Sequence, residues 1–158
     1  MEVPLNSPQP LDSIRCLADL ATERALVGAG TVLNASAVDE VVHAGGQLIV
    51  APNLNRDVGK AAQSAHVAWA PGILSPTEAF AALEAGADSL KIFPAEMAPP
   101  RVVKAMRALL PVDAKLIVVA QEQPHKLGNN YNHVIKRMSA LVSSIHIKRG
   151  LHMLPCVT

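Results

Sequence analysis

The sequence predicts an α/β protein, an incomplete parallel (β/α)8 TIM barrel, and three observations support this. Short apolar segments alternate with helical segments over residues 1–120. Strands that alternate with helices pair in parallel through right-handed crossovers, which leaves a doubly wound sheet or a barrel. Polar residues follow the strands, at the rim where barrel enzymes carry out their chemistry, and no G-x-G-x-x-G or Walker loop is present. A barrel is therefore expected, with too few strands to close.

The strands and helices can be placed from local patterns. Six strands are expected at residues 2–5, 25–29, 47–51, 67–70, 89–93 and 115–119, and helices at 10–22, 35–44, 56–65, 76–85 and 100–109. Ser75 and Glu78 have the spacing of a capping box, Pro76 takes the first helical position, and Gly86 follows the last turn. Asn34 is a suitable cap for the helix at 35–44.

Composition excludes several classes of protein. The net charge of +1 gives no basis for a nucleic-acid or membrane partner. Cys16 and Cys156 lack metal or redox spacing, the histidines lack ligand partners, and neither a membrane span nor a signal peptide is apparent. The expectation is a soluble cytoplasmic protein without a metal site.

The charge pattern changes near residue 120. Residues 1–120 hold 9 Lys and Arg against 12 Asp and Glu, whereas residues 121–158 hold 5 Lys and Arg against Glu122 alone. Such a change within one domain is unusual. We therefore expect a partial barrel over 1–120 and an unrelated basic tail over 121–158.

Lys91 is the most informative candidate residue. It lies in the apolar strand Ser-Leu-Lys-Ile-Phe, where side chains alternate, so Lys91 and Phe93 share one face while Leu90 and Ile92 share the other. If Leu90 and Ile92 pack on helices, Lys91 points into the barrel. Burial disfavours a protonated amine, so the neutral form would become available to attack a carbonyl. The alternative is a lysine with a buried stem and a solvated head.

Glu2 and Thr31 are further candidates. Glu2 shares a strand face with Pro4 and Asn6, and an inward carboxylate could move protons through a water molecule. It could equally be an exposed charge near the N-terminus with no role. Thr31 follows the turn Gly-Ala-Gly and could donate a hydrogen bond to a substrate carboxylate, or simply satisfy the backbone.

Residues 2–119 resemble the 2-keto-3-deoxy-6-phosphogluconate and -galactonate aldolases, the KDPG/KHG aldolase family. Asn6, where phosphogluconate enzymes usually carry arginine, and Val119 favour the phosphogalactonate branch. The stretches that carry the resemblance are EVPLNSP (2–8), ALVGAGTVL (25–33), GGQLIVAPN (45–53), PTEAFAALEAGADSLKIFPAE (76–96) and VKAMRALLP (103–111).

The resemblance implies a homotrimeric barrel that cleaves a phosphorylated keto acid to pyruvate and glyceraldehyde 3-phosphate, without a metal or organic cofactor. Lys91 matches the Schiff-base lysine and Glu2 the general acid/base. Thr31 and Pro71 match residues that line the pyruvate end of the site, and Phe93 matches the aromatic residue beside the lysine.

The chain also departs from the family pattern. The family's first strand and helix are not found before Glu2, and Gln-Glu-Gln-Pro-His (121–125) stands where the family has a Gly-Gly phosphate loop. Codons for that pentapeptide and the lysine after it, re-read two bases along, can spell Gly-Ala-Thr-Pro-Gln, so we expect a frameshift near Ala120. Loss of phosphate-binding N–H groups would impair turnover. An inactive product that serves at most as an interaction partner, and a different phosphate-binding barrel with a structural Lys91, remain alternatives.

Overall fold

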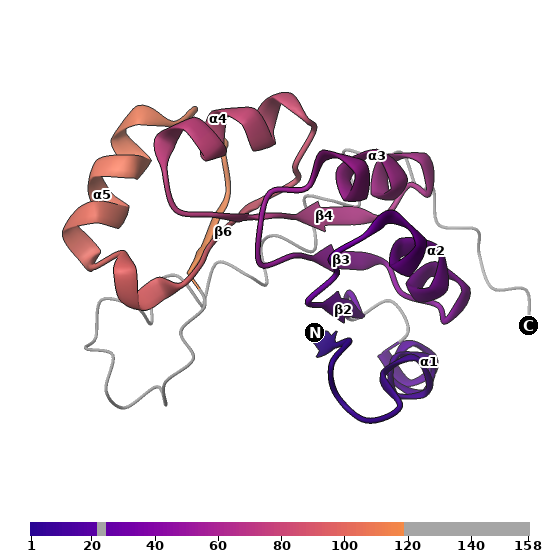
Figure 1. Cartoon of the computed structure of the whole chain (residues 1–158). Coiled ribbons are helices and arrows are strands. Elements are labelled where there is room, and N and C mark those ends of the chain that lie inside the picture. Colours follow the sequence, from indigo (N-terminus) through magenta and orange to yellow (C-terminus); the bar gives the residue numbers. More distant parts are fainter. Residues whose placement is uncertain (22–24, 119–158) are drawn as a thin grey trace, which may run out of the picture.

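The computed structural model describes residues 1–21 and 25–118, which form seven short parallel strands with helices packed along their outer side (Figure 1). The strands are β1 (Glu2–Pro4), β2 (Gly28–Gly30), β3 (Leu48–Val50), β4 (Ala68–Ala70), β5 (Gly72–Ile73), β6 (Leu90–Ile92) and β7 (Leu116–Val118). The helices are α1 (Pro10–Ala21), α2 (Ala35–His43), α3 (Arg56–Ser64), α4 (Pro76–Glu84) and α5 (Pro100–Leu109), with a 3-10 turn η2 (Ala95–Met97).

The helix predictions are confirmed to within one residue at each end. The Ser75 side chain accepts a hydrogen bond from the Glu78 backbone, and the Glu78 side chain in turn accepts one from the Ser75 backbone, so the capping box is complete. Asn34 caps α2 by accepting from the Ala37 backbone at 2.9 Å. These side chains satisfy N–H groups that the first helical turn leaves free, which is why sequence placed these helices well.

The strands form two sheets, ordered β1-β2-β3-β4 and β5-β6-β7, and every pairing is parallel. The sequence analysis ended the fourth strand at residue 70 and did not predict β5, which follows Pro71. Strand β6 bridges this break: the Asp88 N–H donates to the Trp69 carbonyl at 3.0 Å and the Lys91 N–H donates to the Pro71 carbonyl at 2.9 Å. The two sheets are therefore consecutive sections of one barrel wall, interrupted where proline has no N–H to donate.

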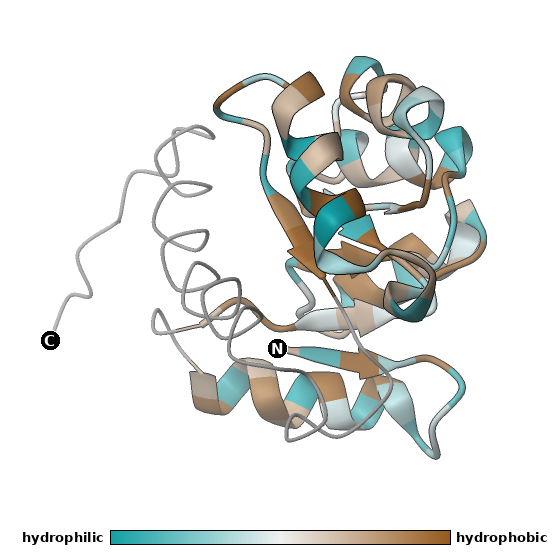
Figure 2. Ribbon diagram, turned by 90° about the vertical axis from the view of Figure 1, so that its left-hand side faces the viewer, coloured by the Kyte–Doolittle hydropathy of each residue, from teal (hydrophilic) through white to brown (hydrophobic). Residues whose placement is uncertain are grey.

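The core lies between the strands and the helices. One cluster packs the outward residues of β2, β3 and β4 against α1, α2 and α3, with Trp69 as its largest member. Trp69 lies directly on Gly59 of α3, where an added Cβ would come within 2.5 Å of the indole ring. A second cluster packs Leu90 and Ile92 against α4 and α5. Figure 2 shows the corresponding pattern, with apolar strands and helices that combine apolar and hydrophilic residues.

The wall is open in the described part of the chain. There β1 pairs only with β2, and β7 pairs only with β6. The fold is thus the predicted incomplete parallel barrel. No helix within residues 1–21 and 25–118 has the length and apolarity needed to cross a membrane.

Candidate active site

Lys91 lies at the middle of β6 with its side chain on the inner side of the wall. Its strand neighbours Leu90 and Ile92 are fully buried in the outer cluster, so alternation along the strand turns Lys91 the other way. The residue is only 6% exposed. Its Nζ lies 4.8 Å from the centre of the Phe93 ring, and it has no hydrogen bond or ion pair to another residue of the described chain. The amine is therefore held by packing and by a cation–π contact.

Glu2 occupies the corresponding inner face of β1, but in a different environment. It pairs in register with Gly28, and its side chain is exposed because β1 has a single neighbour among the described strands. The outward Val3 packs on the helical core, which leaves the Glu2 carboxylate on the side away from the helices. Within the described residues this carboxylate has no hydrogen-bond partner.

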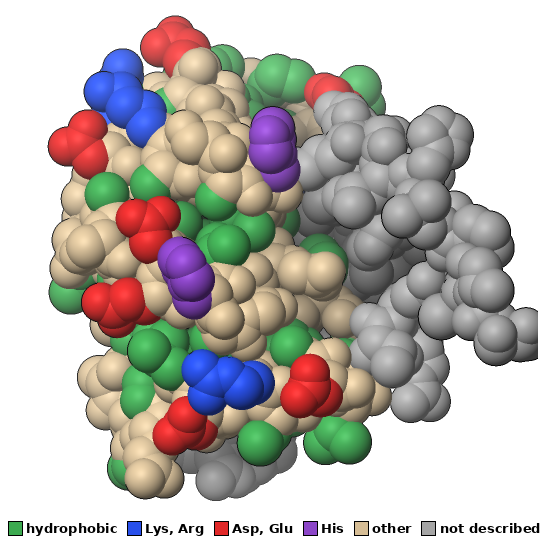
Figure 3. Space-filling model, turned by 90° about the vertical axis from the view of Figure 1, so that its right-hand side faces the viewer, with side chains coloured by type: hydrophobic (Ala, Val, Ile, Leu, Met, Phe, Trp, Pro, Cys, Tyr) green, Lys and Arg blue, Asp and Glu red, His purple; other side chains and the backbone are tan. Residues whose placement is uncertain are grey.

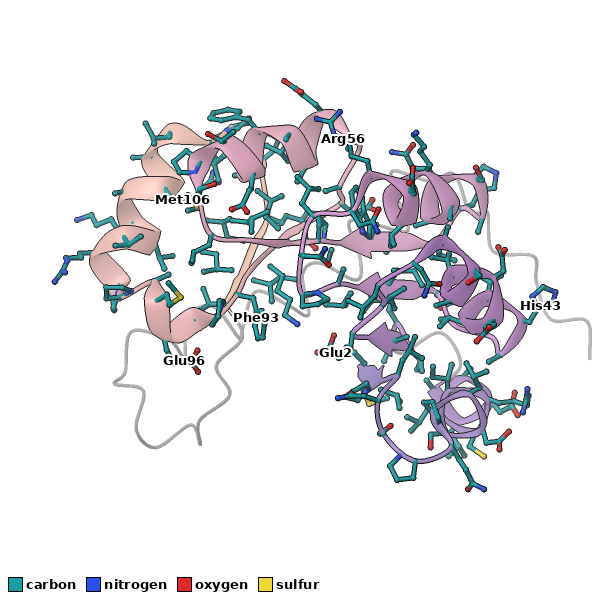
Figure 4. The ribbon with its side chains drawn as sticks, viewed as in Figure 1. Glu2, His43, Arg56, Phe93, Glu96 and Met106 are labelled. Atoms are coloured by element: carbon teal, nitrogen blue, oxygen red, sulfur yellow. The ribbon has the colours of Figure 1, made fainter. Side chains whose placement is uncertain are left out.

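Glu2 and Lys91 thus share the inner surface of the wall. Figure 4 shows Glu2 on one sheet and the Phe93 ring on the other, with both side chains turned toward the region between the two sheets. His43, by contrast, projects outward from the end of α2, where its Nδ1 lies 2.7 Å from the Asp39 carbonyl oxygen. The amine and the carboxylate therefore face the inner side of the wall, whereas the histidine lies on its outer side.

Thr31 has an unusual backbone directly after β2. Its φ is +59°, in the left-handed region that β-branched residues rarely adopt. Its hydroxyl makes no hydrogen bond within the described chain, so it does not satisfy the backbone there. Strain of this kind costs about 1–3 kcal/mol and is concentrated at functional sites. Sequence reasoning selected Thr31 for its hydroxyl and could not have detected the strain.

The remaining predicted substrate-binding residues occupy different places. Pro71 is buried at the break between β4 and β5, where its carbonyl accepts from the Lys91 N–H. Phe93 follows β6, is joined to Pro94 by a cis peptide bond, and contacts the Lys91 amine. Asn6 is exposed in the turn after β1. Val119 lies outside the described residues.

Two inward glycines were missed by the sequence analysis. Gly72 is in register with Lys91, and an added Cβ there would lie 2.1 Å from the Pro52 carbonyl oxygen. Gly30 underlies the Glu2 carboxylate. The sequence analysis interpreted Gly-Ala-Gly as the turn before Thr31, whereas in the structure these residues form β2, because they pair with β1 and β3. Glycine in a strand often marks a place where a ligand or another backbone approaches closely.

The part of the chain that the structure describes shows no metal centre, and the face drawn in Figure 3 shows no charged binding surface. No group of three or more His, Cys, Asp or Glu side chains there could hold a metal ion. Figure 3 shows acidic, basic and histidine side chains scattered over one face, without a patch of a single charge.

A cavity of about 330 Å³ lies at the other end of the strands from the rim. It is formed by the C-terminal end of α4 and by the loops that enter β6 and β7, and is lined by Leu83, Gly86, Ala87, Asp88, Pro111, Asp113, Ala114 and Lys115. Because this is the amino-terminal face of the strands, where barrels place stabilising rather than catalytic residues, we do not assign the reaction to it.

The fold and the inward lysine define a parallel α/β barrel wall with a lysine-centred candidate site at the carboxyl ends of its strands. Residues 1–121 match the KDPG and KHG aldolases, and the chain belongs to this family.

Individual relatives support this assignment. The chain is 44% identical over 128 residues to 2-dehydro-3-deoxy-6-phosphogalactonate aldolase of Escherichia coli (strain K12), which covers 81% of this chain and 62% of the relative. For a probable 2-dehydro-3-deoxy-6-phosphogalactonate aldolase of Rhizobium meliloti (strain 1021), the identity is 42%, and 75% and 56% of the two chains are covered. A solved structure described as native KDPGal superposes with a TM-score of 0.74 at 34% identity, over 94% of this chain and 81% of that chain. The chain thus spans 62% and 56% of the lengths of these two curated relatives.

Proposed function

We propose that the chain carries the catalytic lysine and the general acid/base of a class I aldolase that cleaves 2-dehydro-3-deoxy-6-phosphogalactonate to pyruvate and glyceraldehyde 3-phosphate. The observation that carries the proposal is the buried Lys91 amine on the inner face of β6, which packs on Phe93 and has no ionic partner among the described residues. A structural surface lysine would instead direct its amine into solvent.

The proposed chemistry begins at Lys91. The neutral Nζ attacks the C2 carbonyl carbon of the keto acid, and loss of water from the carbinolamine gives an iminium ion. The C4 hydroxyl then gives up its proton as the C3–C4 bond breaks, and the bonding electrons move into the iminium. Glyceraldehyde 3-phosphate leaves, an enamine remains on Lys91, and protonation at C3 followed by hydrolysis releases pyruvate and restores the amine.

Glu2 is the group proposed to move these protons. Its carboxylate lies on the same inner surface and can accept the C4 hydroxyl proton and later return a proton to C3, directly or through one water molecule. Thr31 and Pro71 would line the end of the site that holds the pyruvate carboxylate, and Phe93 would cover the reacting amine. Asn6 and Val119 are proposed to contact the rest of the sugar acid.

The substrate and the assembly are also part of the proposal. The relatives from Escherichia coli and Rhizobium meliloti are both named for the phosphogalactonate compound, which supports this epimer over the phosphogluconate one. A structurally similar chain forms part of a cage built by fusing symmetric oligomeric domains, which supports a homo-oligomer. We therefore propose a cytoplasmic homotrimer that acts on a small phosphorylated keto acid.

Borohydride trapping tests the proposed function. Incubation with pyruvate and reduction should attach one reduced pyruvate unit to the chain, detected as a mass increase. Lys91→Ala should form no such adduct. Its turnover should be lower by at least about 1,000-fold, the order expected when the nucleophile of a covalent mechanism is removed. Lys104→Ala is the matched control, because Lys104 is an exposed lysine on α5 and should leave labelling unchanged. A folded chain that takes up no label would refute the proposal.

An inactive chain that acts through interactions is the second candidate, favoured by the open edges of β1 and β7 in the described wall. Unpaired strand edges offer backbone groups to another chain. The unrelated tail proposed for residues 121–158 also bears on whether the chain is active, since the family match ends at residue 121. The nucleotide sequence decides whether a shifted reading frame near Ala120 continues with the family's last strand and helix.

A further inference from the structure

The Glu2 carboxylate lies against Gly30 of β2. An added Cβ at Gly30 would lie 3.0 Å from Glu2 Oε2, 3.1 Å from Cδ and 3.5 Å from Oε1. Yet the residue paired with Glu2 in the sheet is Gly28, and Gly30 pairs with Pro4. The side chain therefore leans along the strand, from the position paired with Gly28 toward Gly30.

This displacement is toward the carboxyl ends of the strands. The Lys91 side chain leans the same way, because its amine lies over the ring of Phe93, which directly follows β6. Both functional groups therefore approach the rim from their own strands. The Glu2 side chain has no hydrogen-bond partner in the described chain; its carboxylate contacts β2 at Gly30 and also interacts electrostatically with the Met1 ammonium group.

We propose that Gly30 is a positioning residue for Glu2. Because Gly30 has no side chain, the carboxylate can lie directly over the β2 backbone, and from this position it reaches the substrate bound to Lys91. This inference rests on the proposed function of Glu2. A side chain at position 30 would lift the carboxylate off the strand and move it by a few tenths of an ångström or more. Proton transfer would become slower, while binding of pyruvate at Lys91 would be retained.

The two glycines of β2 are required for different reasons, as Gly28 shows. At Gly28 an added Cβ would lie 1.8 Å from the Leu48 carbonyl oxygen, so the fold itself excludes a side chain. At Gly30 the three nearest atoms all belong to the Glu2 side chain, and φ lies outside the left-handed region. The backbone can therefore accept alanine at position 30, and the expected effect acts through Glu2.

Exchange of the pyruvate methyl protons with deuterium tests the inference. The reaction needs only the iminium on Lys91 and a base: the base removes a methyl proton to give the enamine, and a deuteron from D2O returns to the same carbon. The rate is followed by proton NMR for the unmodified chain, Gly30→Ala, Glu2→Gln and the double variant. We expect Gly30→Ala to lower kcat for exchange about 10-fold with KM for pyruvate unchanged, since a misplacement of 1 Å costs about 100-fold.

The double variant separates positioning from packing. If Gly30 acts through Glu2, adding Gly30→Ala to Glu2→Gln should change the rate by less than about twofold. An equal fall in both backgrounds, or loss of folding in Gly30→Ala as judged by thermal unfolding, would overturn the inference.

A chain without exchange and without a borohydride adduct would refute the proposed function. Whether Gly30 positions the Glu2 carboxylate can still be tested in that case. The ¹³C chemical shift of the Glu2 carboxyl carbon, measured without pyruvate, should then differ between the unmodified chain and Gly30→Ala. An unchanged shift would show that Gly30 does not position this carboxylate.

Discussion

The two strands that carry the candidate catalytic groups differ in how firmly they hold them. Strand β6 lies between β5 and β7, and its outward residues are buried against α4 and α5, so Lys91 projects from a strand fixed on three sides. Strand β1 has one neighbour in the described chain, and Glu2 is exposed. The amine is thus positioned by the core, whereas the carboxylate of Glu2 lies on an edge strand, against Gly30. Substitutions on the two strands should therefore affect stability and rate in different proportions.

The largest contrast is expected for Lys91→Met. This change keeps an unbranched side chain of similar length but removes the nucleophile, so aldolase turnover should fall at least about 1,000-fold. The free energy of unfolding should rise by about 1 kcal/mol, because a buried polar group that makes no hydrogen bond in the described chain is replaced by an apolar one. Urea unfolding together with a turnover assay measures both. A fall of several kcal/mol in stability would show that the amine is a structural group.

Glu2→Gln should affect rate but not stability. Removal of the general acid/base should lower kcat by about 100-fold or more, and borohydride labelling with pyruvate should persist because Lys91 remains. The free energy of unfolding should change by no more than about 0.5 kcal/mol, as is usual for exposed positions. Glu84→Gln on α4 is the control for removal of one carboxylate. Equal rates for the two variants would exclude Glu2 from the reaction.

Thr31→Gly tests whether backbone strain after β2 serves the site. Glycine adopts positive φ without steric cost, so relief of strain should raise the free energy of unfolding by about 1 kcal/mol after the entropy cost of glycine is included. Turnover should fall, because the hydroxyl and the rigid turn are both lost. Thr31→Ser keeps the hydroxyl and serves as the comparison. A turnover rate for Thr31→Gly equal to that of the unmodified chain would remove Thr31 from the site.

The smallest effect is expected from the capping box of α4, the helix that packs against the strand that holds Lys91. Ser75→Ala should lower the free energy of unfolding by about 1 kcal/mol. Hydrogen bonds from the Leu74 backbone and from Ser75 lower the pKa of the Glu78 carboxyl from its ordinary value of 4.5. Because the folded-state pKa is the lower one, this stabilisation is present above pH 4.5 and is lost as the pH falls through the folded-state value.

Chemical unfolding measured from about pH 6 down to about pH 3, through the ordinary carboxyl pKa of 4.5 and below it, tests this prediction. Glu78→Gln should remove the corresponding part of the pH dependence. An identical pH dependence in the variant would show that the capping carboxylate does not contribute.

Sequence predicted the regions whose chemistry is local. Helix starts at Asn34 and Ser75 follow from side chains that bond to nearby backbone, and Gly86 after α4 has a φ of +82°, which glycine adopts readily. Alternation around Lys91 gave its face correctly. Strand β5 was missed because continuation past Pro71 depends on β6, which is distant in sequence. The φ of Thr31 and the position of the Glu2 carboxylate over Gly30 likewise depend on contacts between strands, and no local sequence pattern predicts them.

A crystal structure of the chain reduced with borohydride in the presence of pyruvate tests the central claim most directly. The account predicts a covalent bond from Lys91 Nζ to C2 of the adduct, with the Glu2 carboxylate within about 3 Å of the former methyl carbon or linked to it through one ordered water. A folded chain with no adduct on Lys91, or with the Glu2 carboxylate turned away from it into solvent, would contradict the account.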